Sequence, residues 1–227
     1  MLKRLFRFIA KFTLWFIIMS VALVFLFKWV PVPITPLMLV RYFEADSQKV
    51  IKHEWISIDN ISKHLQLAVI CSEDQNFLNH HGFDYGAIKK AIDYNKKGKR
   101  IRGASTISQQ TAKNVFLWPQ RSWFRKGCET YFTFLIELCW SKQHIMEVYL
   151  NSIEMGEGVY GAEAAAQYWF KKKASKLLKE EGAALASILP NPRKWRAHPP
   201  TAYITSRKQW IVKQMQYFGV LSYEEKR

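Results

Sequence analysis

The chain has 227 residues, 49% of them hydrophobic, which is enough for one domain whose apolar core needs no disulfide framework. It carries 34 Lys and Arg against 18 Asp and Glu, and a formal net charge of +16 favours an anionic partner: nucleic acid, an anionic lipid surface or a phosphate-bearing substrate. Three cysteines (Cys71, Cys128 and Cys139), with no C-x-x-C and no H-E-x-x-H spacing, argue against a disulfide scaffold and against the common zinc motifs.

An apolar segment near the amino end predicts a transmembrane helix over residues 12–30. Its uncharged run from Phe12 to Phe27 follows a basic tail, residues 1–11. A helix of this run is about 24 Å long, short of the ~30 Å hydrocarbon core, but Lys28 can snorkel and Trp29 can lie at the interface. No small residues suited to signal-peptide cleavage follow, so we expect a retained anchor rather than a signal peptide or a buried soluble helix. Because the positive flank is N-terminal, we expect residues 1–11 in the cytoplasm and the remainder outside it.

The predicted anchor also bears on the partners and the domain boundaries expected for the rest of the chain. Outside the cytoplasm the basic residues meet no nucleic-acid pool, so we expect no nucleic-acid partner and favour phosphate carried on lipid. Residues 31–59 are predicted to form a linker, with Asp59 or Asn60 as the N-cap of the first domain helix. A single domain over residues 60–227 follows, without internal repeats.

The first candidate for chemistry is the stretch EDQNFLNHHGFD, which begins with Glu73 and Asp74. Leu65 and Val69 recur at intervals of four and Glu73 continues the series, so a helix from about Ser62 would aim this carboxylate where its apolar face points. An apolar wall disfavours the charged form and suits a carboxylate to proton transfer near neutrality. The alternative is an ordinary solvated helix end.

A second candidate is the segment GASTISQQTAKN after a basic loop that ends at Arg102. Thr106 as N-cap with Gln109 at N3 predicts a capping box, with Ser105 at the same helix terminus. Free backbone N–H groups beside Arg102 would bind an anion. The face that carries Thr106, Gln110 and Lys113 is polar and suits a sugar and a phosphate; the alternative is a well-capped surface helix.

The segment FLWPQRSWFRKGCE combines aromatic residues with a charged cluster. The aromatic residues between 116 and 124 are expected to lie in the core, with a second contact to the membrane surface as the alternative. Arg125, Lys126 and Glu129 lie on neighbouring turns of one predicted helix. They form either a surface salt bridge or a carboxylate held ionised beside a phosphate site. In the second case Glu73 and Glu129 would occupy unlike environments, which is how acid and base roles are divided.

The remaining segments predict a helix from Ser141, a glycine-rich break, an Ala-rich helix over residues 162–170 and a further helix that ends at Pro190. The sequence LPNPR places Arg193 on a rigid turn, and a basic amphipathic helix is predicted over residues 203–218.

Five blocks in this order resemble the monofunctional, membrane-anchored peptidoglycan glycosyltransferases (glycosyltransferase family 51). They are E-D-Q-N-F-x-x-H-x-G-x-D, G-A-S-T-I-S-Q-Q-T-A-K-N, R-K-x-x-E, I-M-E-V-Y-L-N with G-x-G-x-Y-G, and L-P-N-P. The resemblance implies a mainly α, lysozyme-like domain with one N-terminal transmembrane helix in the bacterial inner membrane and a periplasmic catalytic domain. The activity would be glycan-chain polymerisation from lipid II, by inverting β-1,4 transfer with release of undecaprenyl pyrophosphate.

Matching residue by residue, the resemblance makes Glu73 the general base and Glu129 the second catalytic glutamate on the pyrophosphate side. The substrate-binding set would comprise Asp74, Ser105, Thr106, Gln109, Gln110, Lys113, Arg125, Lys126 and Arg193. No resident metal site is expected, although a divalent cation (Mg²⁺ or Mn²⁺) at the pyrophosphate is compatible with the family. The expected partners are lipid II, the growing glycan strand and the membrane, and cell-wall synthesis or division proteins fit the same context.

Two other functions fit part of the sequence. A membrane-anchored lysozyme-like glycosidase or lytic transglycosylase would also use two carboxylates, but it has little reason to gather Lys113, Arg125 and Lys126. A non-enzymatic basic scaffold would explain the charge but not Glu73 on an apolar stripe. A transpeptidase is excluded because no serine is followed by Lys at the third position.

Overall fold

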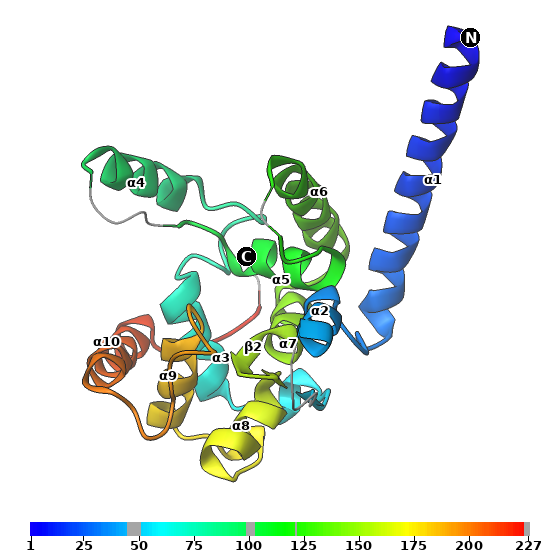
Figure 1. The fold of residues 1–227 in the computed structure, drawn as a ribbon. Helices are drawn as coiled ribbons and strands as arrows, with labels where there is room; N and C mark the ends of the chain where they lie inside the picture. The colour runs from blue at the N-terminus through cyan, green and yellow to red at the C-terminus, as the bar shows by residue number, and fades with distance from the viewer. Residues whose placement is uncertain (45–50, 99–102, 121, 225–227) are drawn as a thin grey trace.

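The computed structural model describes residues 1–44, 51–98, 103–120 and 122–224, and helices dominate it (Figure 1). The α-helices are α1 Leu2–Trp29, α2 Pro36–Glu44, α3 Lys63–Glu73, α4 Tyr85–Lys96, α5 Ile107–Phe116, α6 Trp123–Cys139, α7 Lys142–Ser152, α8 Ala162–Phe170, α9 Lys179–Ile188 and α10 Ala202–Phe218. The strands are β1 Lys52–His53, β2 Glu154–Gly156 and β3 Val159–Tyr160, and short 3-10 helices cover Ile58–Asn60 and Ala174–Lys176. The prediction of a mainly α domain is confirmed.

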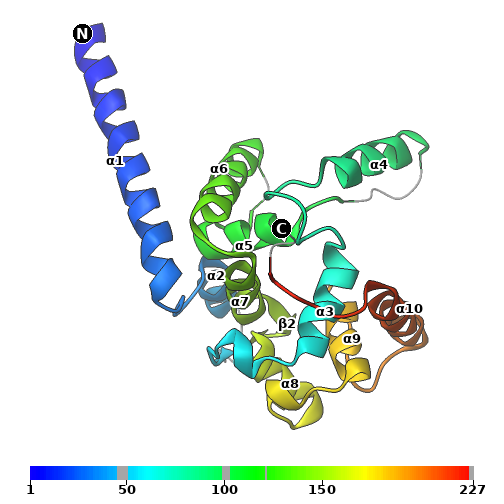
Figure 2. The same cartoon turned by 180° about the vertical axis from the view of Figure 1, so that it is seen from behind.

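Helix α1 is longer than the predicted transmembrane segment. It begins at Leu2 rather than near residue 12, so the basic tail is helical as well. Its 28 residues span about 42 Å, more than the ~30 Å hydrocarbon core, and its composition is apolar enough to cross a membrane. The amino-terminal half of α1 stands clear of the other helices in both views (Figures 1 and 2), as expected of a helix solvated by lipid.

The carboxyl-terminal half of α1 is fixed to the domain by polar contacts. The hydroxyls of Ser20 and Tyr131 lie 2.7 Å apart, and Trp140 Nε1 donates a hydrogen bond to the carbonyl oxygen of Val24 at 2.9 Å. Ser20 and Val24 are the buried residues of α1. Helix α1 is thus held against α6 and the α6–α7 junction.

The predicted linker over residues 31–59 is wrong in part, because it contains secondary structure. Helix α2 lies within it, and β1 pairs in parallel with β3, with Lys52 opposite Val159. Strand β2 completes a three-stranded sheet by pairing antiparallel with β3. The N-cap of α3 is Ser62, whose hydroxyl accepts from the His64 N–H, instead of Asp59 or Asn60.

The core lies where α3, α9 and α10 pack together on one side and α5, α6 and α7 on the other (Figure 2). Gly182 on α9 lets α9 and α3 approach closely, because a Cβ at this position would meet backbone atoms of His64 and Leu65 at 3.0 Å. The helices predicted over 162–170 and 203–218 are confirmed as α8 and α10. The predicted helix before Pro190 is shorter than expected, since residues 174–176 form a 3-10 turn before α9.

The aromatic stretch after α5 is divided between core and surface. Phe116 stacks on Phe132 with ring centroids 4.5 Å apart, as the core prediction requires. Trp118 is partly exposed, whereas Trp123 and Phe124 are 92% and 74% exposed, so for these residues the core prediction is wrong. They lie at the start of α6, the helix to which the anchor is attached.

Candidate active site

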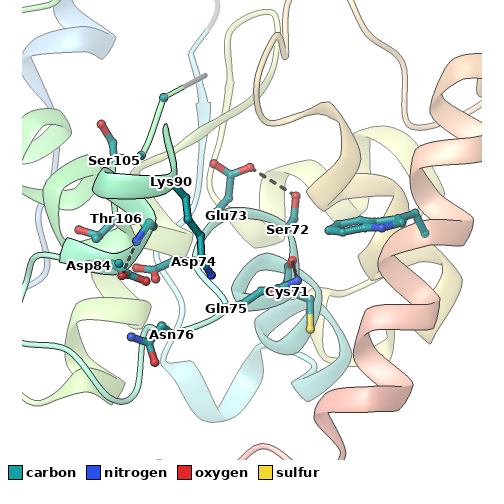
Figure 3. A pocket seen from close by; sticks show the side chains of 15 residues that line it. Cys71, Ser72, Glu73, Asp74, Gln75, Asn76, Asp84, Lys90, Ser105 and Thr106 are labelled. Atoms are coloured by element: carbon teal, nitrogen blue, oxygen red, sulfur yellow. Dashed lines mark hydrogen bonds between the residues drawn. The ribbon is translucent and has the colours of Figure 1, made fainter. Parts of the chain in front are cut away.

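Glu73 is the last residue of α3, and its side chain leaves the core for a polar cleft. Its Oε2 accepts a hydrogen bond from Gln110 Nε2 at 3.0 Å, and Ser72 Oγ lies 3.4 Å from Oε1 (Figure 3). Leu65 and Val69 are fully buried as predicted, but the expected apolar wall around Glu73 is wrong. The helix ends at this residue, so the carboxylate meets polar groups of α5 instead of continuing the buried stripe.

The cleft beside Glu73 has a volume of about 640 Å³ and is bounded by four parts of the chain: the end of α3, the start of α4, residues 103–106, and Trp210 on α10. Figure 3 shows Glu73, Lys90 and Ser105 around this space. A cavity of this size, open to solvent and lined mainly by polar groups, is suited to a sugar rather than to an apolar ligand.

Asp74 holds the site together from inside. Its oxygens lie 2.9 and 3.1 Å from Nε2 of the buried His80, and Oδ2 also accepts the Ile107 N–H at 3.0 Å. This carboxylate therefore joins the end of α3 to the first residue of α5. Because both oxygens already have protein donors and the residue is 7% exposed, its evident role is structural, and its predicted contact with substrate stays a prediction.

The predicted cap of α5 is confirmed. Thr106 Oγ1 accepts the Gln109 N–H, and Gln109 Oε1 accepts the Thr106 N–H, both at 3.1 Å. Thr106 Oγ1 also donates to the carbonyl oxygen of Gly82 at 2.7 Å. Thr106 and Gln109, both predicted to contact substrate, therefore use their side chains in the helix cap. Ser105 is exposed at the cleft. Arg102, part of the predicted anion site, lies outside the described residues.

The second predicted carboxylate is buried within a basic cluster. Glu129 is 3% exposed, its Oε2 accepts from Arg125 Nη1 at 3.1 Å, and its Oε1 accepts from Lys126 Nζ. Burial rules out the solvated surface salt bridge considered as an alternative. A carboxylate that pairs with two cations sets the position of both positive groups.

Helix α5 connects the two carboxylates. Gln110, which binds Glu73, and Lys113 lie one turn apart, about 4.5 Å along the axis, on the same face. Burial lowers the pKa of Lys113, and Glu129 opposes this most strongly among its neighbours; Arg125, Lys126 and Glu73 also act on it. Lys113 is therefore within electrostatic reach of both Glu73 and Glu129; their predicted roles in catalysis stay a prediction.

Some site residues were missed by the sequence reasoning. Tyr149 is fully buried on α7 and its hydroxyl donates to Gln110 Oε1 at 3.3 Å, which orients the amide that binds Glu73. Burial raises the pKa of Tyr149 well above its ordinary value, and the charges of Glu73 and Asp74 act in the same direction. The signal available in the sequence was the tyrosine hydroxyl, which needs a hydrogen-bond partner when the residue is buried.

Arg193 does not join this group. It is exposed, and its Nη2 pairs with Oε1 of Glu157, in the β2–β3 turn, at 3.0 Å. Its carboxylate neighbours are Glu157, Glu154 and Glu44 rather than Glu73 or Glu129. Its predicted contact with substrate stays a prediction.

The basic cluster around Glu129 fits a divalent cation poorly. Within the described ranges, no group of three or more His, Cys, Asp and Glu residues is placed to hold a metal ion. Beside the basic cluster the carboxylate is Glu129, which already pairs with Arg125 and Lys126. Divalent cations such as Mg²⁺ prefer several oxygen ligands, whereas this region offers mostly positive charge.

Comparison with known proteins identifies the family. Residues 41–216 match the family model described as Transglycosylase. Proteins named biosynthetic peptidoglycan transglycosylase from Mannheimia succiniciproducens, Pseudomonas putida (strain F1) and Bacteroides thetaiotaomicron are each 50% identical to this chain. The alignments cover 92%, 98% and 94% of this chain and 88%, 96% and 88% of the relatives, respectively. The lysozyme-like helical fold and the enzyme class expected from the sequence are thereby confirmed, and the chain belongs to the transglycosylase family.

Proposed function

We propose that this enzyme polymerises glycan strands from lipid II by inverting β-1,4 transfer of the disaccharide-peptide, with release of undecaprenyl pyrophosphate. The names of its relatives support the substrate class. The observation that carries the proposal is a pair of glutamates in unlike surroundings, both of which act electrostatically on Lys113: Glu73 among neutral donors, and Glu129 within a cluster of cations. Such a division separates a proton acceptor from a site for negative charge.

In this mechanism Glu73 is the general base. The 4-hydroxyl oxygen of the acceptor sugar attacks the anomeric carbon of the donor, and its proton passes to the Glu73 carboxylate. Gln110 holds Oε2 through a 3.0 Å hydrogen bond and is itself fixed by Tyr149. The base is thereby kept in one orientation, with its carboxylate on the cleft.

The leaving group departs from the opposite face of the sugar, which gives inversion. The bond between the anomeric carbon and the pyrophosphate oxygen breaks, and the electron pair leaves with the pyrophosphate. Lys113, Arg125 and Lys126 would stabilise the charge that develops there. Glu129 positions the last two cations through its ion pairs and needs no proton of its own to do so.

The anchor brings this cleft to a lipid-borne substrate. Helix α1 is long and apolar enough to cross a membrane, and the exposed Trp123 and Phe124 lie on α6, against which it packs. We place the amino terminus in the cytoplasm and the domain on the periplasmic face of the inner membrane, because the positive residues precede the apolar run. The net charge of +16 then faces anionic lipid.

The test is incubation of the detergent-solubilised protein with labelled lipid II, followed by gel separation with and without muramidase. High-molecular-weight, muramidase-sensitive product from the wild type and none from Glu73→Gln would support polymerisation with Glu73 as base. Shortening of added preformed glycan without any polymer would favour the glycosidase or lytic transglycosylase instead.

A further inference from the structure

Helix α10 reaches the catalytic carboxylate through one side chain. Arg207 Nη2 donates to Ser72 Oγ at 3.3 Å, and Ser72 directly precedes Glu73. Two further contacts bring α10 to the same end of α3: Gln75 Nε2 donates to Gln214 Oε1 at 3.3 Å, and Trp210 lines the cleft. The carboxyl-terminal helix is thus a wall of the active site.

The charge of Arg207 has no direct counterion among the described residues. None of the ion pairs within 4.0 Å includes it, and its buried Nε has no hydrogen-bond acceptor. A half-buried guanidinium without a counterion is costly unless it acts on a nearby acceptor. The acceptor that the structure provides is the hydroxyl of Ser72.

This contact limits what the Ser72 hydroxyl can do. A hydroxyl that accepts from a guanidinium must direct its own single proton elsewhere. Two acceptors lie near Ser72 Oγ: Glu73 Oε1 at 3.4 Å and the carbonyl oxygen of Ala186 at 3.3 Å. Figure 3 draws the contact between Ser72 and Glu73 as a dashed line. With Gln110 on Oε2, donation by Ser72 to Oε1 would hold both oxygens of Glu73.

We propose that Arg207 is a positioning residue for the general base, acting through Ser72 on Glu73. The guanidinium fixes the hydroxyl and supplies positive charge beside Ser72, the residue that precedes Glu73. This inference rests on the proposed function, because it concerns the base of that reaction. It assigns to α10 a part in catalysis that its amphipathic sequence pattern does not indicate.

The test compares steady-state polymerisation of lipid II by the full-length protein and five variants. Arg207→Met and Ser72→Ala should each lower kcat about tenfold and leave KM within about twofold. The double variant should be no slower than the slower single variant, because both changes remove one relay. Arg207→Lys, which keeps the charge, should recover most of the rate, and Lys213→Met, an exposed lysine on the same helix, should match the wild type. Thermal unfolding of every variant checks the fold.

Three results would overturn the proposal while leaving the proposed function intact. They are losses that multiply in the double variant, a rise in KM at unchanged kcat, and a rate for Arg207→Met equal to that of Lys213→Met. A drop in melting temperature that accounts for the lost activity and is equal in Arg207→Met and Arg207→Lys would likewise reduce Arg207 to a structural role. A wild-type protein that makes no polymer would refute the proposed function itself, and this inference with it.

Discussion

Replacing each of the two glutamates by glutamine should separate catalysis from stability. Glu129 is 3% exposed and pairs with the buried Arg125 and with Lys126. In Glu129→Gln the amide keeps the shape but leaves a buried guanidinium without its counterion, which costs about 3 kcal/mol. For a domain of this size the melting temperature should fall by roughly 6–12 °C. Activity should also fall, since the two cations lose the group that positions them.

Glu73→Gln should behave in the opposite way. Glu73 lies at the open end of α3, and its carboxylate contacts the neutral side chains of Gln110 and Ser72. An amide oxygen can still accept from one of them, so we expect a stability change within about 1 kcal/mol, or about 3 °C. Turnover should fall by about 10²- to 10⁴-fold because the general base is gone, while lipid II binding is retained.

Both variants are compared with the wild type in one detergent by thermal unfolding, lipid II binding and the polymerisation assay. The ratio of lost rate to lost stability should be large for Glu73→Gln and small for Glu129→Gln. Equal drops in melting temperature would refute the contrast between a cleft carboxylate and a buried one. Loss of lipid II binding in proportion to the lost rate in Glu73→Gln would refute its role as base.

Three further outcomes follow from the geometry. Gly161→Ala should lower the free energy of unfolding by about 1–3 kcal/mol, because φ is +83° and a Cβ would lie 2.9 Å from a main-chain oxygen of α7. The control is Gly127→Ala, where a Cβ would lie in open space. Equal melting temperatures for the two variants would contradict this prediction. Burial lowers the pKa of Lys113, so as the pH rises its charge and the activity should be lost at a lower pH than for an ordinary lysine. Lys113→Arg should move the alkaline limb of the pH–rate profile to higher pH. An unmoved limb would contradict a role for the Lys113 charge in the reaction. Replacing both Trp123 and Phe124 by serine should leave the melting temperature unchanged. Turnover by this variant should fall in liposomes but not in detergent micelles. An equal fall in liposomes and in micelles would refute a contact of these two residues with the bilayer.

The sequence was most informative where the interactions are local. The capping box of Thr106 and Gln109 spans three residues and was found in full. The group of Arg125, Lys126 and Glu129 was likewise visible from its helical spacing, although its burial was not. Such features depend on residues within one helical turn, and the spacing of these residues can be read from the sequence.

Contacts between distant segments were not predictable in this way. Gln110 lies 37 residues after Glu73, and β1 pairs with a strand about a hundred residues later, with two-residue strands that are too short to show alternation. The apolar wall expected around Glu73 failed for a related reason. Periodicity gives the direction of a side chain within a helix, but what it meets beyond the last turn depends on the tertiary packing of another helix.

The placement of α5 explains why these distant parts form one site. Its first residue is held by Asp74 at the end of α3, and it packs against α6 and α7. One face of this helix then presents Gln110 to Glu73 and, a turn later, Lys113 to Glu129. The spacing between the partner of the proposed base, Gln110, and the cation Lys113 is therefore set by the pitch of a helix, which is rigid, rather than by loops. A site that must hold a nucleophile and a leaving group on opposite faces of one sugar needs such a fixed spacing.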